Sequence, residues 1–115
     1  SIRYSTLGDN GTAAAFTEAG TLDLLNPIND LAMSYDYLNR PYVATLLDNG
    51  SVRLHWLGIA GATVGAYNGG VVTDSADSTK PIALVRSADG MQLALSYHDT
   101  TNLKTVVIYA DGDSN

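Results

Sequence analysis

The chain has 115 residues, 45% of them hydrophobic, and its 6 basic and 12 acidic residues give a net charge of −6. This composition is typical of an ordered globular domain, and the scarcity of Lys and Arg argues against a nucleic-acid partner, because phosphate binding depends on clustered basic side chains. Cysteine is absent, which excludes disulfides and thiolate metal sites. No apolar run approaches the roughly 20 residues of a membrane-spanning helix.

The elements expected along the chain are β-strands joined by tight turns, because the apolar residues show no sustained helical period. One pattern occurs three times, with a mean period of about forty residues. Each copy opens with an apolar run that ends in a turn, at 4–11, 30–40 and 81–90. Second strands are expected at 12–17, 41–47 and 91–97, and third strands at 21–25, 51–56 and 103–109. The second copy has further apolar segments at 62–67 and 71–73, which leave room for a fourth strand.

Short turn signals separate these strands. Asn10-Gly11 and Asn49-Gly50 are the strongest, because Asn-Gly tolerates the positive φ values of a two-residue type I′ hairpin. Asp89-Gly90 and Ala19-Gly20 are expected to act in the same way. Since the strands between the turns are apolar on nearly every residue, both faces of the sheets are expected to be covered by neighbouring sheets.

These elements predict an all-β fold of about three four-stranded, propeller-like blades, some of them incomplete. The blade-like units are expected at about 1–28, 29–76 and 77–115. A closed propeller has about four to eight blades, so we expect closure by oligomerisation or by chain that this sequence does not contain. A β-trefoil, which is also built from three units of this size, and a β-sandwich are the alternatives.

Four segments of the second copy, 30–34, 40–44, 48–54 and 64–67, resemble a blade of the fucose-binding six-bladed lectin family. Small members of that family assemble one propeller from several short chains. Their sugar is held by an arginine near the start of the second strand, a glutamate in the third and a downstream tryptophan. Arg40 lies near the first of these positions and Trp56 ends the third strand, whereas the glutamate has no counterpart. The resemblance therefore implies the propeller architecture more strongly than it implies the binding of fucose.

Other candidate ligand-binding residues crowd the end of the third strand of the second copy. Arg53 and His55 accompany Trp56 there, and an aromatic ring beside charged groups is typical of a sugar site. Strand alternation offers a second interpretation, in which Trp56 shares a core face with Val52 and Leu54 while Arg53 and His55 lie on the other face.

The third copy has a comparable group at the end of one strand. Tyr97, His98 and Asp99 are candidates to line the same kind of groove between blades. The alternative is that His98 and Asp99 are ordinary turn residues.

A candidate metal site lies near the end of the sequence. Asp111, Asp113 and Asn115 place oxygen ligands at alternate positions, as at the start of a calcium loop. No later acidic ligand follows in this sequence, so the ligand set for Ca²⁺ is partial. The sequence suggests no other cofactor.

The sequence offers no catalytic constellation, since it has one glutamate and two histidines. We therefore expect a non-catalytic, lectin-like module that recognises a carbohydrate or another small polar ligand between blades, in an extracellular setting. The alternatives are a structural or assembly subunit of an extracellular or viral particle, and a propeller fragment of a larger secreted enzyme. The expected partners are a glycan and further copies of the chain, or a second chain that completes the fold.

Overall fold

The computed structural model describes residues 2–6, 17–22, 26–57 and 63–109. Within these ranges the chain forms nine β-strands and no helix, which confirms the all-β prediction. The strands are β1 (Ile2–Thr6), β2 (Thr17–Leu22), β3 (Ile28–Tyr35), β4 (Pro41–Leu47), β5 (Val52–Leu57), β6 (Thr63–Thr73), β7 (Ala83–Arg86), β8 (Gln92–His98) and β9 (Leu103–Tyr109). The described part of the chain accordingly holds no helix long and apolar enough to cross a bilayer.

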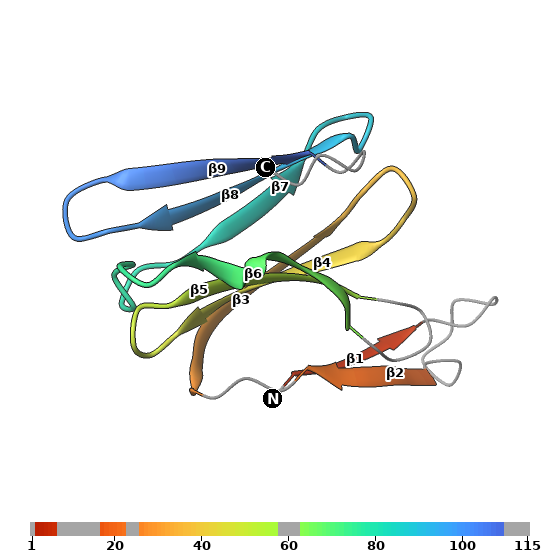
Figure 1. The fold of residues 1–115 in the computed structure, drawn as a ribbon, viewed down its shortest axis with the longest axis horizontal. Coiled ribbons are helices and arrows are strands. Elements are labelled where there is room, and N and C mark those ends of the chain that lie inside the picture. Colours follow the sequence, from red (N-terminus) through yellow and green to blue (C-terminus); the bar gives the residue numbers. More distant parts are fainter. Residues whose placement is uncertain (1, 7–16, 23–25, 58–62, 110–115) are drawn as a thin grey trace.

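The strands form three antiparallel sheets that lie one over another (Figure 1). β1 pairs with β2, β3 to β6 form a four-stranded meander, and β7 to β9 form a three-stranded meander. Apart from Ile28, the first residue of β3, the strands of the two larger sheets fall within the second and third predicted units, 29–76 and 77–115. The described ranges make a stack of sheets and no closed ring, so closure of a propeller stays a prediction.

The turn between β4 and β5 contains the predicted Asn49-Gly50 pair, but its backbone conformation differs from the one expected. Gly50 has φ +86° and its amide donates to the Leu47 carbonyl at 3.1 Å, whereas Asn49 is not among the residues with positive φ. This is a tight turn followed by a left-handed glycine, not the expected type I′ hairpin. A Cβ on Gly50 would lie 2.6 Å from the Ala76 carbonyl oxygen, so the position needs glycine for space as well as for φ.

The predicted Ala19-Gly20 turn is wrong. Both residues lie inside β2, where Tyr4 pairs with Gly20 and Ser5 with Glu18, so that Ala19 is the extra residue of a β-bulge. Glycine marks bulges as well as turns, and the sequence signal alone does not separate the two.

Other expected boundaries of strands also changed. The described part of the expected run 62–67, from Thr63 on, and the expected run 71–73 fall in one long strand, β6 (Thr63–Thr73), whose pairing with β5 is interrupted by register shifts. Of the expected strand at 12–17, only Thr17 is described, and it begins β2; Asn10-Gly11 lies outside the described residues.

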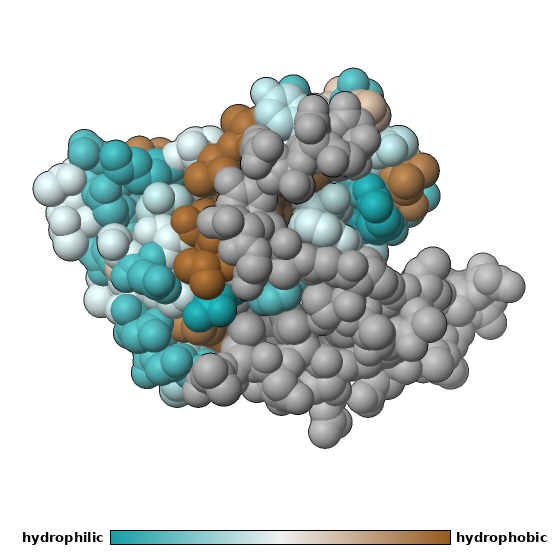
Figure 2. All heavy atoms as spheres, viewed as in Figure 1, coloured by the Kyte–Doolittle hydropathy of each residue, from teal (hydrophilic) through white to brown (hydrophobic). Residues whose placement is uncertain are grey.

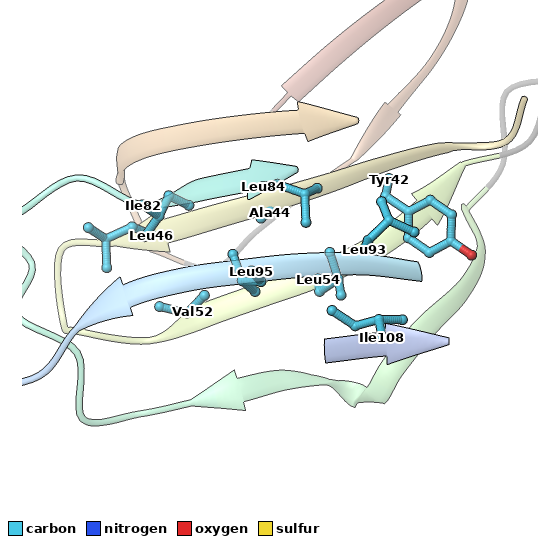
Figure 3. Packing of buried hydrophobic residues seen from close by; sticks show 10 residues of the cluster. All are labelled: Tyr42, Ala44, Leu46, Val52, Leu54, Ile82, Leu84, Leu93, Leu95 and Ile108. Atoms are coloured by element: carbon cyan, nitrogen blue, oxygen red, sulfur yellow. The ribbon is translucent and has the colours of Figure 1, made fainter. Parts of the chain in front are cut away.

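The core lies between the two larger sheets (Figure 3). Alternate residues of β4 and β5 face β7, β8 and β9, and every residue from Tyr42 to Leu47 is buried. The cluster consists of Tyr42, Ala44, Leu46, Val52, Leu54, Ile82, Leu84, Leu93, Leu95 and Ile108. Burial of these side chains, at about 25 cal/mol per Å² of apolar surface, is the main force that holds one sheet on the other. The stacking also brings β3 beside β7.

Candidate ligand-binding cleft

The structure separates the residues that the sequence suggested as a site around β5. Trp56 packs against the core, with its ring centroid 5.7 Å from that of Tyr42 at an interplanar angle of 45°. Arg53 and His55 alternate with it and therefore lie on the opposite face of the sheet. The Arg53 guanidinium donates to the Ser51 hydroxyl at 2.9 Å.

Two polar groups on that opposite face have no hydrogen-bond partner among the residues that the structure describes. They are the Thr45 hydroxyl and His55 Nδ1, which are both buried. Burial, and secondarily the nearby charge of Arg53, lowers the pKa of His55, because both disfavour the imidazolium form. His55 is therefore neutral at physiological pH in the folded chain.

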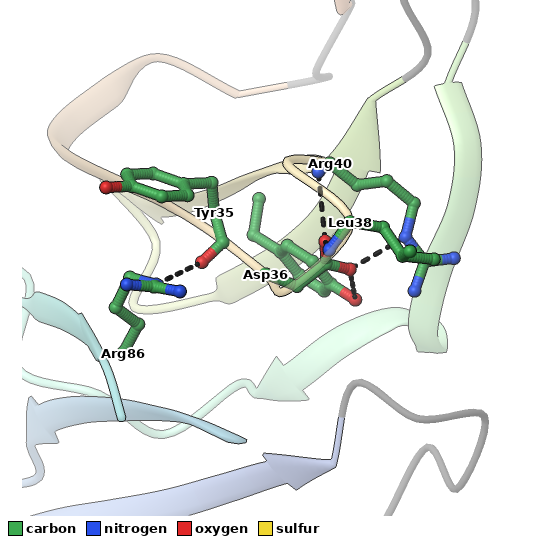
Figure 4. A network of polar contacts seen from close by, with 6 residues as sticks. Tyr35, Asp36, Leu38, Arg40 and Arg86 are labelled. Carbon is green, nitrogen blue, oxygen red and sulfur yellow. Dashed lines mark hydrogen bonds and ion pairs between the residues drawn. The ribbon is translucent and has the colours of Figure 1, made fainter. Parts of the chain in front are cut away.

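Arg40 belongs to a polar network within the turn between β3 and β4 (Figure 4). Its Nε donates to the Asp36 carboxylate at 2.7 Å, and the Tyr42 hydroxyl donates to the same oxygen at 3.2 Å. Burial, followed by the neighbouring charge of Asp36, raises the pKa of Tyr42 to about 12. The network fixes the turn, and its geometry explains Arg40 without a ligand.

The same end of the stack is tied to the three-stranded sheet. The Tyr37 amide donates to the Gly90 carbonyl at 3.0 Å, and Arg86 Nε donates to the Tyr35 carbonyl at 3.1 Å. The Arg86 guanidinium also lies 4.6 Å from the centroid of the Tyr35 ring, a cation–π distance (Figure 4).

Tyr97, His98 and Asp99 lie at the opposite end. Tyr97 packs against the core, and the His98 carbonyl accepts the Asp77 amide at 2.7 Å. Asp99 accepts the amides of Thr101 and Asn102 at 2.8 and 2.6 Å, which is the geometry of a turn residue. The structure therefore does not bring Arg40 or Trp56 together with this group.

A cleft of about 250 Å³ lies close to this second end, between the start of β3 and the segment that joins β6 to β7. Its lining residues are Asn29, Asp30, Leu46, Ser78, Thr79, Lys80 and Pro81. In the orientation of Figure 1, hydrophilic side chains gather at the left, over the end of the stack that carries the β6–β7 and β8–β9 connections (Figure 2).

Asp30 joins the two sheets at the cleft. One carboxylate oxygen accepts the Leu31 amide and the other accepts the Ile82 amide, both at 2.9 Å. Asn29 adds a second tie, because its side-chain amide donates to the Ser78 carbonyl at 3.0 Å. The start of β3 and the start of the next sheet are thus held in a fixed relation by side chains.

Asp77 orders the segment that forms the other wall. It accepts the Thr79 hydroxyl at 2.6 Å and the Thr79 amide at 2.9 Å, and these bonds hold the pKa of its carboxyl below the ordinary value. The Lys80 amide donates to the Asp77 carbonyl at 3.2 Å. The turn therefore sets the direction in which the chain presents Lys80 at the cleft.

Three groups of the cleft remain available to a ligand among the residues that the structure describes. The Lys80 ammonium and the Ser78 hydroxyl have no partner there, and Asn29 uses its amide nitrogen but not its carbonyl oxygen. Together they offer donors and an acceptor that match hydroxyl or carboxylate groups of a small polar molecule.

Sequence reasoning missed all seven lining residues. The polar run that ends in Asp77, Ser78, Thr79, Lys80 and Pro81 was visible as a loop, and Asp-x-Thr is a side-chain turn signal. No local signal connects this loop with Asn29, because Asn29 and Ser78 are 49 residues apart in the chain.

Within the described ranges there is no group of three or more His, Asp or Glu residues arranged to hold a metal ion. The predicted calcium ligands Asp111, Asp113 and Asn115 lie outside the described residues, and that site stays a prediction. No protein-family model, curated protein or solved structure gives a significant match to this chain.

Proposed function

We propose that this chain is a non-catalytic binding module that takes a small, hydroxyl-rich ligand, such as a carbohydrate, in the cleft between its two larger sheets. The observation that carries the proposal is the convergence of Asn29, Ser78 and Lys80 on one cleft whose walls Asp30 and Asp77 hold in place. Because the walls of the cleft are fixed before a ligand arrives, no entropy is lost in ordering them on binding.

The arrangement of the sheets supports a propeller-like architecture for this module. A complete four-stranded meander, a second meander packed face to face on it, and neighbouring first strands β3 and β7 are the features expected of consecutive blades. Such a module works in an extracellular setting, where glycans are displayed. The cleft then lies in the groove between two blades.

The size and lining of the cleft define the ligand further. A volume of about 250 Å³ is below the roughly 300–1,000 Å³ of sites for drug-sized molecules, so a single sugar unit is the appropriate size. No aromatic side chain is among the lining residues, so binding depends on hydrogen bonds and on the Lys80 charge. We expect dissociation constants of about 1 mM for a monosaccharide, with a preference for sugars that carry a carboxylate.

The test is a titration of the isotope-labelled chain with neutral and acidic monosaccharides, followed by amide chemical shifts. The proposal is supported if the amide shifts change at Asn29 and 78–80 and if the sugar affinity falls at least fivefold in Lys80→Ala and in Ser78→Ala. Lys104→Ala is the matched control, because Lys104 is the other lysine and lies on β9 beside Asp99 at 3.8 Å. Shifts confined to Trp56 and Arg53, or no binding of any sugar, would overturn it.

A further inference from the structure

The three-stranded sheet has an outer face that is exposed and carries no formal charge. The residues that alternate with its core positions are Ala83, Val85, Gln92, Ala94, Ser96, His98, Leu103, Thr105, Val107 and Tyr109. The solvated face of an antiparallel sheet ordinarily carries polar and charged side chains, which also protect it from other sheets. Val85 is nevertheless 59% exposed, and Leu103, Val107 and Tyr109 are exposed as well. This face has the composition of a surface that another element covers.

The same face has a hollow. Val85, Ala94 and Val107 are paired in one row across β7, β8 and β9, with the smallest side chain in the middle. A depression of about 250 Å³ lies over this row, and Arg86, Ser87 and Gln92 are among the other residues that line it. A row of branched, small and branched side chains suits the insertion of a projecting apolar side chain from a partner.

A projecting apolar strip lies on the far side of the four-stranded sheet. Leu31, Met33 and Tyr35 are the residues of β3 that alternate with the ones facing the core, and all three are exposed. Met33 is 63% exposed, and its unbranched side chain adapts to irregular hollows. The three residues of this strip are uncharged, and the Arg86 guanidinium, which also lines the hollow, lies 4.6 Å from the centroid of the Tyr35 ring.

We propose that a second copy of this chain packs the Leu31, Met33 and Tyr35 strip of its β3 into the hollow over Val85, Ala94 and Val107. The contact continues the stacking already present within one chain, where the other face of β3 lies beside β7. The two surfaces differ and lie on opposite sides of the paired sheets, so the assembly is head to tail. The inference rests on the proposed stacking of blade-like sheets and is independent of ligand binding in the cleft.

The experiment measures the mass of the chain by light scattering across a concentration series. The wild-type mass is expected to rise to at least twice that of the monomer, while Met33→Lys and Val85→Lys each remain monomeric, because a buried unpaired ammonium opposes the contact. Leu38→Lys is the matched control, since Leu38 is 57% exposed in the turn after β3 and lies on neither surface. It is expected to associate like the wild type.

A mixture of the two lysine variants tests the head-to-tail geometry. Each variant keeps one intact surface, so an equal mixture is expected to form a dimer of twice the monomer mass through one native contact. The absence of cysteine allows a direct check, in which a short bismaleimide joins Met33→Cys to Val85→Cys but does not join either variant to itself. A wild-type chain that stays monomeric, a mixture that does not recover the dimer, or crosslinks within a single variant would each overturn the proposal.

Failure of this proposal is distinguishable from failure of ligand binding. Lys80→Ala is expected to lose sugar affinity and keep the wild-type mass, whereas Met33→Lys is expected to lose association and keep sugar affinity. A parallel loss of mass in Lys80→Ala would contradict the independence of the two surfaces.

Discussion

The carboxylate of Asp36 and the guanidinium of Arg40 form an ion pair of 2.7 Å, although the Asp36 side chain is 0% exposed to solvent. Burial alone would raise the pKa of Asp36, but the hydrogen bonds from the Arg40 amide and guanidinium and the Leu38 amide outweigh it, so the pKa is lowered. The charge is thus satisfied by the turn that contains it. Loss of the Asp36 charge therefore weakens the hydrogen bonds that fix the turn, and loss of the turn leaves that charge without its donors.

Asp36→Ala is expected to destabilise the chain by about 2–4 kcal/mol, because it leaves buried amide groups and the Arg40 guanidinium without their shared acceptor. The measurement is urea denaturation followed by tryptophan fluorescence, with Trp56 as the single reporter. Asp99→Ala is the control, since Asp99 caps a more exposed turn, and its effect is expected to be smaller. Equal losses in both variants would contradict the special role of Asp36.

The lowered pKa of His55 predicts that the folded chain loses stability in mild acid. Its pKa in the folded chain is lowered below the ordinary value of 6.5, so its contribution to stability is fully present above that pH and is lost as the pH falls toward the folded pKa. We expect the melting temperature to fall from about pH 7 to pH 5, and His55→Phe to flatten that dependence. His98→Gln is the control and is expected to retain it. An unchanged pH dependence in His55→Phe would show that another group is responsible.

The site of Gly90 is not expected to tolerate a methyl group. Gly90 has φ +74°, and a Cβ there would lie 2.6 Å from the Tyr37 amide nitrogen and would also meet the Arg86 guanidinium. Gly90→Ala is expected to cost about 1–3 kcal/mol in thermal unfolding. Asn39→Gly is the matched comparison, because Asn39 has φ 60°, and its stability is expected to stay within about 1 kcal/mol of the wild type or rise.

Leu95 tests the contribution of the core between the sheets. It is fully buried in the cluster, and Leu95→Ala is expected to destabilise the chain by about 2–5 kcal/mol in chemical denaturation. Leu38→Ala removes the same atoms from an exposed turn and is expected to change stability by no more than about 0.5 kcal/mol. Similar effects of the two substitutions would mean that the sheets do not pack as described.

Asp30 links stability to the proposed ligand cleft. Asp30→Ala removes the acceptor of the Ile82 amide, so we expect a loss of about 1–3 kcal/mol in stability and weaker sugar binding. Asp30→Asn keeps one carbonyl acceptor and is expected to lose less of both. The two properties are measured on the same samples, by denaturation and by titration. Unchanged sugar affinity in a folded Asp30→Ala variant would show that the cleft does not depend on the Asp30–Ile82 hydrogen bond.

Local sequence signals predicted the strands of the two larger sheets well. The runs at 41–47 and 103–109 coincide with β4 and β9, and Gly50 and Gly90 both adopt positive φ at the predicted turns. These features depend on the alternation and φ preferences of neighbouring residues, which are present in the sequence itself. The Ala19-Gly20 signal failed because glycine serves a bulge within a strand as readily as a turn between strands.

The candidate site could not be predicted in the same way, because its residues come from separate parts of the chain. The residue types made Trp56 and Arg40 candidates for sugar binding, and only the structure shows that Trp56 packs against the core and that Arg40 pairs with Asp36. Asn29 and Ser78 meet only because one sheet is stacked on the other, and they are 49 residues apart in the chain.

An all-β chain, the spacing of its strands and the turns that need glycine can be predicted from the amino-acid sequence, because these follow from local alternation and backbone conformation. The packing of the sheets determines which face of each strand is covered, where Asp30 joins the sheets and which apolar strips stay exposed. Those outcomes depend on the relative position in which the two sheets pack over a shared core, which is a property of the whole stack and not of any one strand.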